Sequence, residues 1–340
     1  MKAILQRAWR TRGWLARLLW PLSQLYGLVI GLRTFLYVHG FLASTRMGVP
    51  VVVVDNLVAG GAGKTPLVIA LANHLREQGI CVGVISRGYG RVSQLCLEVH
   101  WETSIDASGD EPALIKRATG APVFVASRRV EAAGALLSAY PLTQVLICDD
   151  GLQHLALVRD IEIAVFDDRG AGNGWLLPAG PLREPWSKKR RDSVNLVLHT
   201  GRTPAFEGFS SSRYLSSVAV AVDGSTVALS SLIGQPLVAM AGIATPDAFF
   251  AMLANIGLTL TQTIALPDHQ NFSDYKIPVK TGSTILCTEK DAVKLFQLPA
   301  TSRTRLLAVP LVFMPEPAFM QALDMLLAPL LSQLPSRHGH

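Results

Sequence analysis

The chain is 340 residues long; 49% of its residues are hydrophobic, only 16% are charged, and its mean hydropathy of +0.33 is high for a wholly soluble enzyme. At roughly 150 residues per domain, this length predicts two domains with a large buried core. The net charge is +6 and no acidic residue precedes Asp55, so the N-terminal segment suits an anionic surface, either nucleic acid or phospholipid headgroups.

The four cysteines, Cys81, Cys96, Cys148 and Cys287, form no CxxC pair, which argues against a metal knuckle. Cys148 and Cys287 interrupt apolar runs, as buried thiols do. This usage indicates a reducing compartment, the cytosol.

Residues 14–43 mix arginines with tryptophan, tyrosine and leucine. The longest stretch without a charge runs from Leu18 to Leu32 and contains Pro21, which falls short of the roughly 18–20 apolar residues that span a bilayer. Basic residues with Trp and Tyr are typical of a helix lying in the headgroup region, and this is the prediction. A helix packed on the domain, a single membrane span and a signal peptide are the alternatives, the last without an obvious cleavage site.

Apolar strands then alternate with helices. The pattern predicts strands at 50–54, 81–86, 121–127, 144–150, 161–167 and 194–200, with helices at 67–79 and 128–140. Continuous apolar strands separated by helices indicate a mostly parallel sheet covered on both faces, an α/β fold.

The pattern loosens at 200–225, where Gly, Ser and Pro accumulate. A second, smaller α/β alternation follows, with strands at 236–244, 258–266, 283–288 and 306–314, and helices near 246–256, from 290 and at the C-terminus. The predicted organisation is an N-terminal arm at 1–45, a nucleotide-binding domain at 46–210, a smaller α/β domain at 211–335 and a disordered tail at 336–340.

The stretch VVVVDNLVAGGAGKTP at 51–66 begins within the first strand of this alternation and leads to its first helix. It has Val58 where the phosphate-loop pattern GxxxxGK[ST] has its first glycine, but it keeps the residues of the pattern that bind phosphate and metal. Its glycines let backbone N–H groups face phosphates, Lys64 reaches the β- and γ-phosphates, and the Thr65 hydroxyl binds Mg²⁺. The predicted ATP-binding residues are Gly60, Gly61, Ala62, Gly63, Lys64, Thr65 and Pro66. An ordinary glycine-rich turn is the weaker alternative.

The strand VLICDD ends in Asp149 and Asp150, well downstream of the loop. Acidic groups at such a strand end hold Mg²⁺ directly or through water, so both are predicted metal ligands. The form GGAGKT is also similar to membrane-cycling ATPases of the cell-division type. Those carry a lysine before the paired glycines, where this chain has Ala59.

Several motifs in order along the chain resemble one family, tetraacyldisaccharide 4'-kinase, the lipid A kinase of Gram-negative bacteria. They are DNLVAGGAGKTP (55–66), SRGYGR (86–91), GDEP (109–112), DDGLQH (149–154), GNGWLLPAGPLREP (172–185), PDHQNF (267–272) and TEKDAVK (288–294). Asp55, Val58 and Gln270 depart from the family's pattern.

The resemblance implies a phosphate-loop fold with a smaller α/β domain behind a hinge. It implies transfer of the γ-phosphate of ATP, with Mg²⁺, to the 4'-hydroxyl of a tetraacyldisaccharide 1-phosphate. The partners expected are this acylated phospholipid and the inner-membrane surface on its cytoplasmic side, with no nucleic acid and no obligate protein partner.

The resemblance also assigns roles to residues. Asp110 in GDEP is the expected general base, against the alternative that Asp110 or Glu111 caps a helix. His269 is expected to orient Asp110 once the domains close, and Asp150 to act beside Lys64 in catalysis. The expected acceptor-binding residues are Arg87, Glu111, Gln153, Arg183 and Glu184. The basic run 188–191 is either a solvated helix face or a contact for the 1-phosphate or the membrane.

Two other functions fit parts of the chain. A nucleotide-switch ATPase that cycles on the membrane would use the loop and the arm, but it leaves GDEP and PDHQNF without a role. A nucleic-acid-binding ATPase is suggested by charge alone, and the basic residues lie among tryptophans and leucines rather than along a groove.

Overall fold

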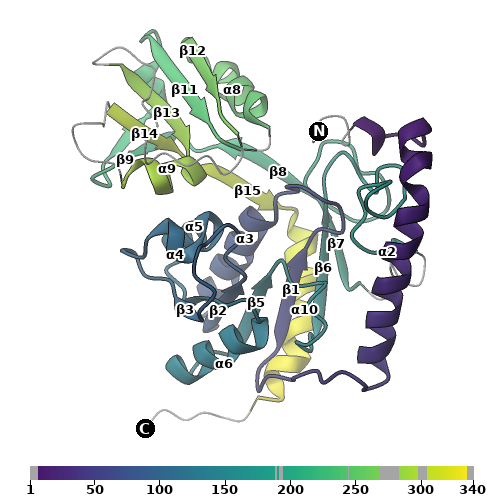
Figure 1. Ribbon diagram of the computed structural model, residues 1–340. Coiled ribbons are helices and arrows are strands. Elements are labelled where there is room, and N and C mark those ends of the chain that lie inside the picture. The colour runs from purple at the N-terminus through teal and green to yellow at the C-terminus, as the bar shows by residue number, and fades with distance from the viewer. Residues whose placement is uncertain are drawn as a thin grey trace.

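The structure is a computed structural model that describes residues 7–187, 190, 194–243, 245–267, 283–297 and 305–334. Within these residues the strands form two sheets, of nine and six strands. In Figure 1 the smaller sheet lies at the top of the view, and the larger sheet and its helices lie below it.

The larger sheet has the strand order β15-β8-β7-β6-β1-β5-β2-β4-β3. Its central strands are parallel and almost wholly buried, as their continuous apolar sequence predicts. They are β1 (Val51–Asp55), β2 (Val82–Ser86), β4 (Val123–Val125), β5 (Val145–Asp149), β6 (Ile161–Phe166) and β7 (Leu196–His199). The short β3 (Leu97–Glu98) pairs antiparallel with β4 at one edge.

Helices cover both faces of this sheet, which confirms the α/β prediction. Alternate side chains of β1 point to opposite faces, so Val52 and Val54 pack with α3 (Lys64–Glu77), α5 (Asp110–Thr119) and α10 (Pro317–Ser332). Val51 and Val53 face the other way, toward α6 (Arg129–Ala139). The short α4 (Ile105–Ser108) precedes α5.

The smaller sheet has the order β10-β9-β14-β13-β11-β12. Four parallel strands form it, β11 (Leu237–Ala241), β12 (Leu260–Ala265), β13 (Thr284–Thr288) and β14 (Arg305–Val309), and the antiparallel β9 (Val218–Ala221) and β10 (Thr226–Ala228) extend it. One face packs on α8 (Pro246–Asn255) and the short helix η1 (Leu229–Leu232), and the other on α9 (Glu289–Leu295).

Two antiparallel strands connect the sheets, β8 (Phe209–Leu215) and β15 (Leu311–Pro315). The polar β8 was not predicted, because its sequence FSSSRYL lacks an apolar face and reads as a loop. The predicted single strand at 306–314 is wrong: Pro310 separates β14 from β15, and the two belong to different sheets. With β15 the chain returns to the larger sheet, and Phe319 of α10 joins the core of that sheet. The predicted unit at 211–335 therefore includes β15 and α10, which pack with the larger sheet.

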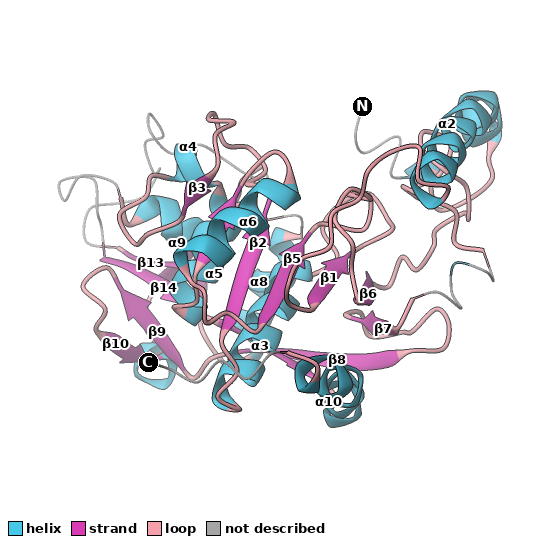
Figure 2. Ribbon diagram, turned by 90° about the horizontal axis from the view of Figure 1, so that it is seen from below, coloured by secondary structure: helices cyan, strands magenta, loops and turns pink. Residues whose placement is uncertain are grey.

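The N-terminal arm forms α2 (Trp14–Val38), with Ala16 and Ser23 as its buried residues. It lies at the side of the larger sheet, as Figures 1 and 2 show from two directions. By length and composition alone it could cross a membrane. One side docks on the loop after β6: Ser23 Oγ donates to the Leu176 carbonyl at 2.8 Å, and Tyr26 Oη donates to the Arg183 carbonyl at 3.1 Å. Much of the rest is exposed and apolar, including Leu18, Leu25, Leu28 and Leu32.

Candidate active site

The phosphate loop links β1 to α3 at the carboxyl edge of the larger sheet. Gly63 caps α3 with φ of +85°, a left-handed conformation that disfavours any side chain. α3 begins at Lys64, so its free N–H groups and the positive end of its dipole face the loop. This is the anion-binding arrangement expected of 60–66.

Three side chains from three strand ends hold the loop by its carbonyl oxygens. Asn56, after β1, donates through Nδ2 to the Val58 and Gly60 carbonyls at 2.6 and 2.5 Å. Arg169, after β6, donates to the carbonyls of Ala59 and Gly61 at 3.2 and 3.0 Å, and Thr200, after β7, donates to that of Ala62 at 2.7 Å. With its carbonyls bound to the protein in this way, the loop can present N–H groups to a phosphate.

Arg169→Met is expected to raise KM for ATP about tenfold with little change in the thermal unfolding midpoint. Arg169 is itself held by Asp167, at 2.9 Å from Nε to each carboxylate oxygen, and its two bonds to the loop are charge-assisted. The two bonds from Arg169 to the loop contribute about 1.5 kcal/mol or more, and losing this free energy corresponds to a roughly tenfold rise in KM. Steady-state kinetics with varied ATP measure it. Arg128→Met is the control, because Arg128 is an exposed arginine that pairs with Glu131. An unchanged KM would contradict the role.

Four charged side chains meet beneath the loop. Lys64 Nζ lies 3.3 Å from Asp55 Oδ1 and also bonds Asp150, and Arg183 Nη1 lies 2.9 Å from Asp150 Oδ1 and 3.5 Å from Asp55 Oδ1. Asp55, one of the three departures from the family's pattern, is fully buried and accepts the Leu152 N–H at 3.0 Å. The structure thus brings the predicted Lys64, Asp150 and Arg183 together, with Asp55 between them.

Burial and these ion pairs together determine the charge states of Asp55, Lys64 and Asp150. Burial raises the pKa of Asp55 to about 6, although the positive charge of Lys64 opposes this. Burial alone would lower the pKa of Lys64 and raise that of Asp150, but the ion pairs reverse both: the Lys64 pKa is raised, and that of Asp150 lies well below its usual range. Lys64 and Asp150 are therefore charged near neutral pH.

The backbone of Asp150 is also unusual. Its φ of +57° is left-handed, which is uncommon for a residue other than glycine and is often seen at functional sites. Arg129, a buried residue that the sequence analysis did not identify, donates from Nη2 to the Asp150 carbonyl at 2.8 Å and supports this conformation.

Asp149 ends β5 next to β1 and is fully buried. Its Oδ2 accepts from Ser86 Oγ at 3.4 Å, while its Oδ1 has no hydrogen-bond partner among the described residues. Burial raises the pKa of Asp149 to about 8, and the negative charge of Glu111 adds to this while Lys64 opposes it. An unpartnered buried carboxylate oxygen suits a cation.

Asp149 and the buried Thr65 hydroxyl fit the requirements of Mg²⁺. Within the described ranges no three His, Cys, Asp or Glu side chains cluster as a metal cage. Mg²⁺ bound with a nucleotide uses one or two carboxylates together with phosphate oxygens and water, so this donor set is sufficient.

Asp110 is the first residue of α5, and Gly109 rather than Asp110 or Glu111 caps the helix, without a side-chain capping bond. The helix-cap alternative for these residues is therefore wrong. Instead Asp110, which is buried, pairs with Lys294 Nζ of α9 at 2.7 Å. Lys294 comes from the smaller sheet's side and was not predicted as a site residue; its motif is a capped helix start, with Thr288 accepting from the Asp291 N–H at 3.2 Å.

The expected acceptor-binding residues are only partly brought together. Gln153 Nε2 donates to Glu184 Oε1 at 3.3 Å, beside Arg183, and Glu111 is close enough to influence Asp149. Arg87 is exposed after β2. Of the basic run 188–191 the structure describes Arg190, which pairs with Glu162 and Glu184. His269 lies outside the described residues.

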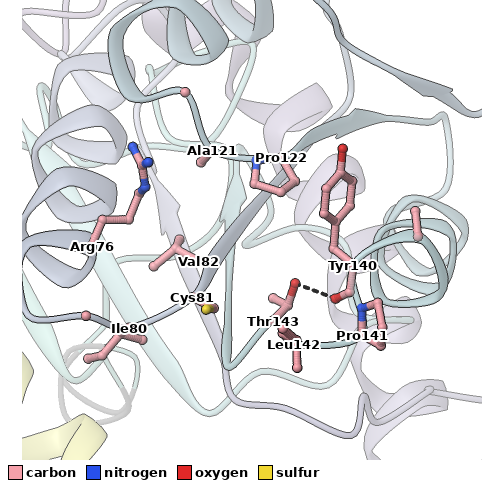
Figure 3. A pocket seen from close by; sticks show the side chains of 13 residues that line it. Arg76, Ile80, Cys81, Val82, Ala121, Pro122, Tyr140, Pro141, Leu142 and Thr143 are labelled. Atoms are coloured by element: carbon pink, nitrogen blue, oxygen red, sulfur yellow. Dashed lines mark hydrogen bonds between the residues drawn. The ribbon is translucent and has the colours of Figure 1, made fainter. Parts of the chain in front are cut away.

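A hollow of about 530 Å³ lies at the opposite edge of the larger sheet, near the starts of β2 and β5. Figure 3 shows its lining, in which Arg76, Ile80 and Pro122 surround Val82, and Thr143 bonds the Tyr140 carbonyl. The residues assigned to phosphate and metal binding follow the other ends of these strands, so this hollow is separate from the candidate active site.

Comparisons with known proteins identify the family of the chain. The family model for tetraacyldisaccharide-1-P 4'-kinase matches residues 15–328. A tetraacyldisaccharide 4'-kinase from Polaromonas naphthalenivorans is 65% identical over 100% of this chain and 99% of its own, and one from Acidovorax sp. (strain JS42) is 54% identical over 96% and 95%. The crystal structure of LpxK from Aquifex aeolicus in complex with ATP has a TM-score of 0.80 at 30% identity, covering 93% of this chain and 99% of that one. The chain belongs to the tetraacyldisaccharide 4'-kinase family.

Proposed function

We propose that this protein transfers the γ-phosphate of ATP to the 4'-hydroxyl of a tetraacyldisaccharide 1-phosphate at the cytoplasmic face of the bacterial inner membrane. The observation that carries the proposal is the carboxyl edge of the larger sheet, where Lys64 of the phosphate loop and Asp149 lie next to Asp150 and Arg183. The family supplies the substrate class.

Phosphoryl transfer asks the protein mainly for positioning and charge neutralisation. The loop N–H groups and the start of α3 would bind the phosphates, and Lys64 would offset their charge. Asp149 and Thr65 would hold Mg²⁺, which supplies further neutralisation of the β- and γ-phosphates. The ion pairs of Asp150 with Lys64 and Arg183 would keep both cations aimed at the reacting groups.

In the transfer step, the 4'-hydroxyl oxygen would form a bond to the γ-phosphorus while the bond to the ADP oxygen breaks. The hydroxyl proton would pass to the carboxylate of Asp110, with His269 orienting that carboxylate. Asp110 is buried at the start of α5, against Lys294 of the smaller sheet's helix α9, so both sheets contribute to its surroundings. Glu111, on the next position of α5, would bind the acceptor close to Asp149.

The acceptor would reach the site from the membrane side. The arm α2 presents an exposed apolar surface and docks through Tyr26 on the carbonyl of Arg183, next to Glu184 and Gln153. A helix of this kind in the headgroup region would place the acceptor-binding loop near the lipid surface. Arg87 would contact a phosphate of the acceptor or of ATP.

The test is transfer of radiolabelled γ-phosphate from ATP to extracted tetraacyldisaccharide 1-phosphate in detergent with Mg²⁺. We expect labelled lipid from the parent protein and from Lys116→Ala, whose lysine donates to the Ala121 carbonyl at 3.1 Å. Lys64→Ala is expected to give less than about 1% of the label, because the loop loses its phosphate-binding cation. ATP binding without labelled lipid in the parent protein would contradict the proposal and favour a nucleotide switch.

A further inference from the structure

The connecting strand β8 carries an arginine that lies against the phosphate loop. A Cβ atom built on Gly63 would sit 2.2 Å from Arg213 Nη2, so the guanidinium packs directly on the loop residue that caps α3. On its other side the guanidinium faces the ring of Phe313 on β15, at 5.6 Å from the ring centroid. The Arg213 side chain is thus placed by both connecting strands.

This placement is electrostatically unfavourable for a cation. The start of α3 carries the positive end of the helix dipole, and Lys64 follows Gly63 directly. Arg213 forms no ion pair or hydrogen bond through its side chain within the described part of the chain. Its nearest carboxylates are occupied: Asp167 binds Arg169, and Asp168 accepts the Thr203 N–H at 2.8 Å.

The guanidinium is also partly desolvated. Arg213 as a whole is exposed, yet packing around its charged end lowers its pKa, and the charges of Asp167 and Asp168 offset this only in part. A cation desolvated at the positive end of a helix, without a carboxylate partner, is balanced when an anion binds between them.

We propose that Arg213 binds a terminal phosphate of ATP at the phosphate loop and thereby ties the nucleotide to the connection between the two sheets. The anion is identified by position, because the guanidinium lies on the loop residue immediately before Lys64, where the backbone is arranged for phosphates. This inference rests on ATP as the nucleotide and not on the acceptor.

Arg213 lies in the part of β8 that joins the two sheets. Among the described strands, β8 pairs with β7 of the larger sheet at Phe209 and Ser210 and with β15 from Ser211 to Leu215, before the chain enters β9 of the smaller sheet. A phosphate held by Arg213 therefore acts on the segment that joins the two sheets, and its charge favours the arrangement in which Arg213 reaches the loop.

The test is the dissociation constant of ATP without acceptor, measured by calorimetry in detergent for the parent protein, Arg213→Met, Arg213→Lys and a control. Arg305→Met is the matched control, because Arg305 is an exposed arginine at the start of β14 on the far sheet. We expect Arg213→Met to weaken ATP binding about tenfold or more, since a charge-assisted bond is lost. Arg213→Lys should recover part of this affinity, and Arg305→Met should match the parent.

An ATP affinity of Arg213→Met within twofold of the parent would overturn the inference. A second result would also overturn it: Arg213→Met and Arg213→Lys lose ATP affinity equally, and both unfold at a lower temperature than the parent without nucleotide. That pattern would show that Arg213 serves to pack against Phe313 rather than to bind phosphate. The binding experiment contains no acceptor, so neither of these two results bears on phosphate transfer. The kinase assay still tests the proposed function independently.

Discussion

Asp149→Asn is expected to lower the turnover of phosphate transfer by at least a hundredfold and, at the same time, to raise the unfolding midpoint of the ligand-free protein. Asp149 is fully buried, and its Oδ1 has no partner among the described residues, so the ionised carboxylate is costly to keep there. An amide of the same shape removes this cost but no longer offers a carboxylate to Mg²⁺.

The difference in stability between Asp149→Asn and the parent should depend on pH. The pKa of Asp149 is raised from its ordinary value of 3.8 to about 8 in the folded protein. Between these values the folded state binds more protons than the unfolded state, so the stability of the parent falls as the pH rises from 4 through 8. Asp149→Asn removes this contribution, so its advantage in unfolding midpoint should be small at pH 5 and largest at pH 8–9. Asp55, whose pKa is raised to about 6, continues to act in both proteins.

Thermal unfolding without ATP or Mg²⁺ at several pH values measures this, beside the transfer assay. One kcal/mol corresponds to roughly 2–4 °C for a chain of this size or somewhat smaller. Asp247→Asn, an exposed carboxylate of α8, is the control and should differ from the parent by under about 1 kcal/mol at every pH. If the midpoint difference between Asp149→Asn and the parent does not change with pH, burial does not destabilise the ionised Asp149 carboxylate.

The parts of the site that could be predicted from sequence are those that lie close together along the chain. An apolar strand, a glycine-rich turn and a helix follow one another at 51–77, so the loop, Lys64 and Thr65 were predicted from the local pattern. Asp149 and Asp150 were predicted because the carboxyl ends of parallel strands lie at one edge of the sheet, where the phosphate loop also lies. The burial of β1 and β5 on both faces makes these strands easy to recognise.

The residues that were missed depend on contacts between distant segments. Arg169 binds loop carbonyls from more than a hundred positions away, and Lys294 reaches Asp110 from the other sheet. Nothing in the immediate sequence of either residue indicates its partner: DDRG reads as a turn and TEKDAVK as a capped helix. The polar strand β8 was missed for a related reason, because pairing with β15 rather than an apolar face makes it a strand.

Asp110→Asn is expected to lower turnover by roughly a hundredfold to ten-thousandfold while ATP binding stays within about twofold of the parent. The substitution removes the group proposed to accept the 4'-hydroxyl proton but keeps the shape of the side chain. Its amide oxygen can still accept from Lys294 Nζ, which lies 2.7 Å from the carboxylate. The fold around the start of α5 should therefore survive, and Glu111 keeps its place beside Asp149.

A comparison with Lys294→Met separates catalysis from structure, since removing one partner of a buried ion pair can itself destabilise a protein. If Asp110 serves only to pair with Lys294, the two variants should lose turnover and unfolding midpoint together. If Asp110 is the base, Lys294→Met keeps the carboxylate and should retain turnover to within about tenfold, whereas Asp110→Asn should not. Turnover under saturating ATP and acceptor, with the calorimetric dissociation constant of ATP, gives both quantities. Near-normal turnover of Asp110→Asn would move the proton-accepting role to another group at the same edge of the sheet, with Asp150 as the next carboxylate to replace.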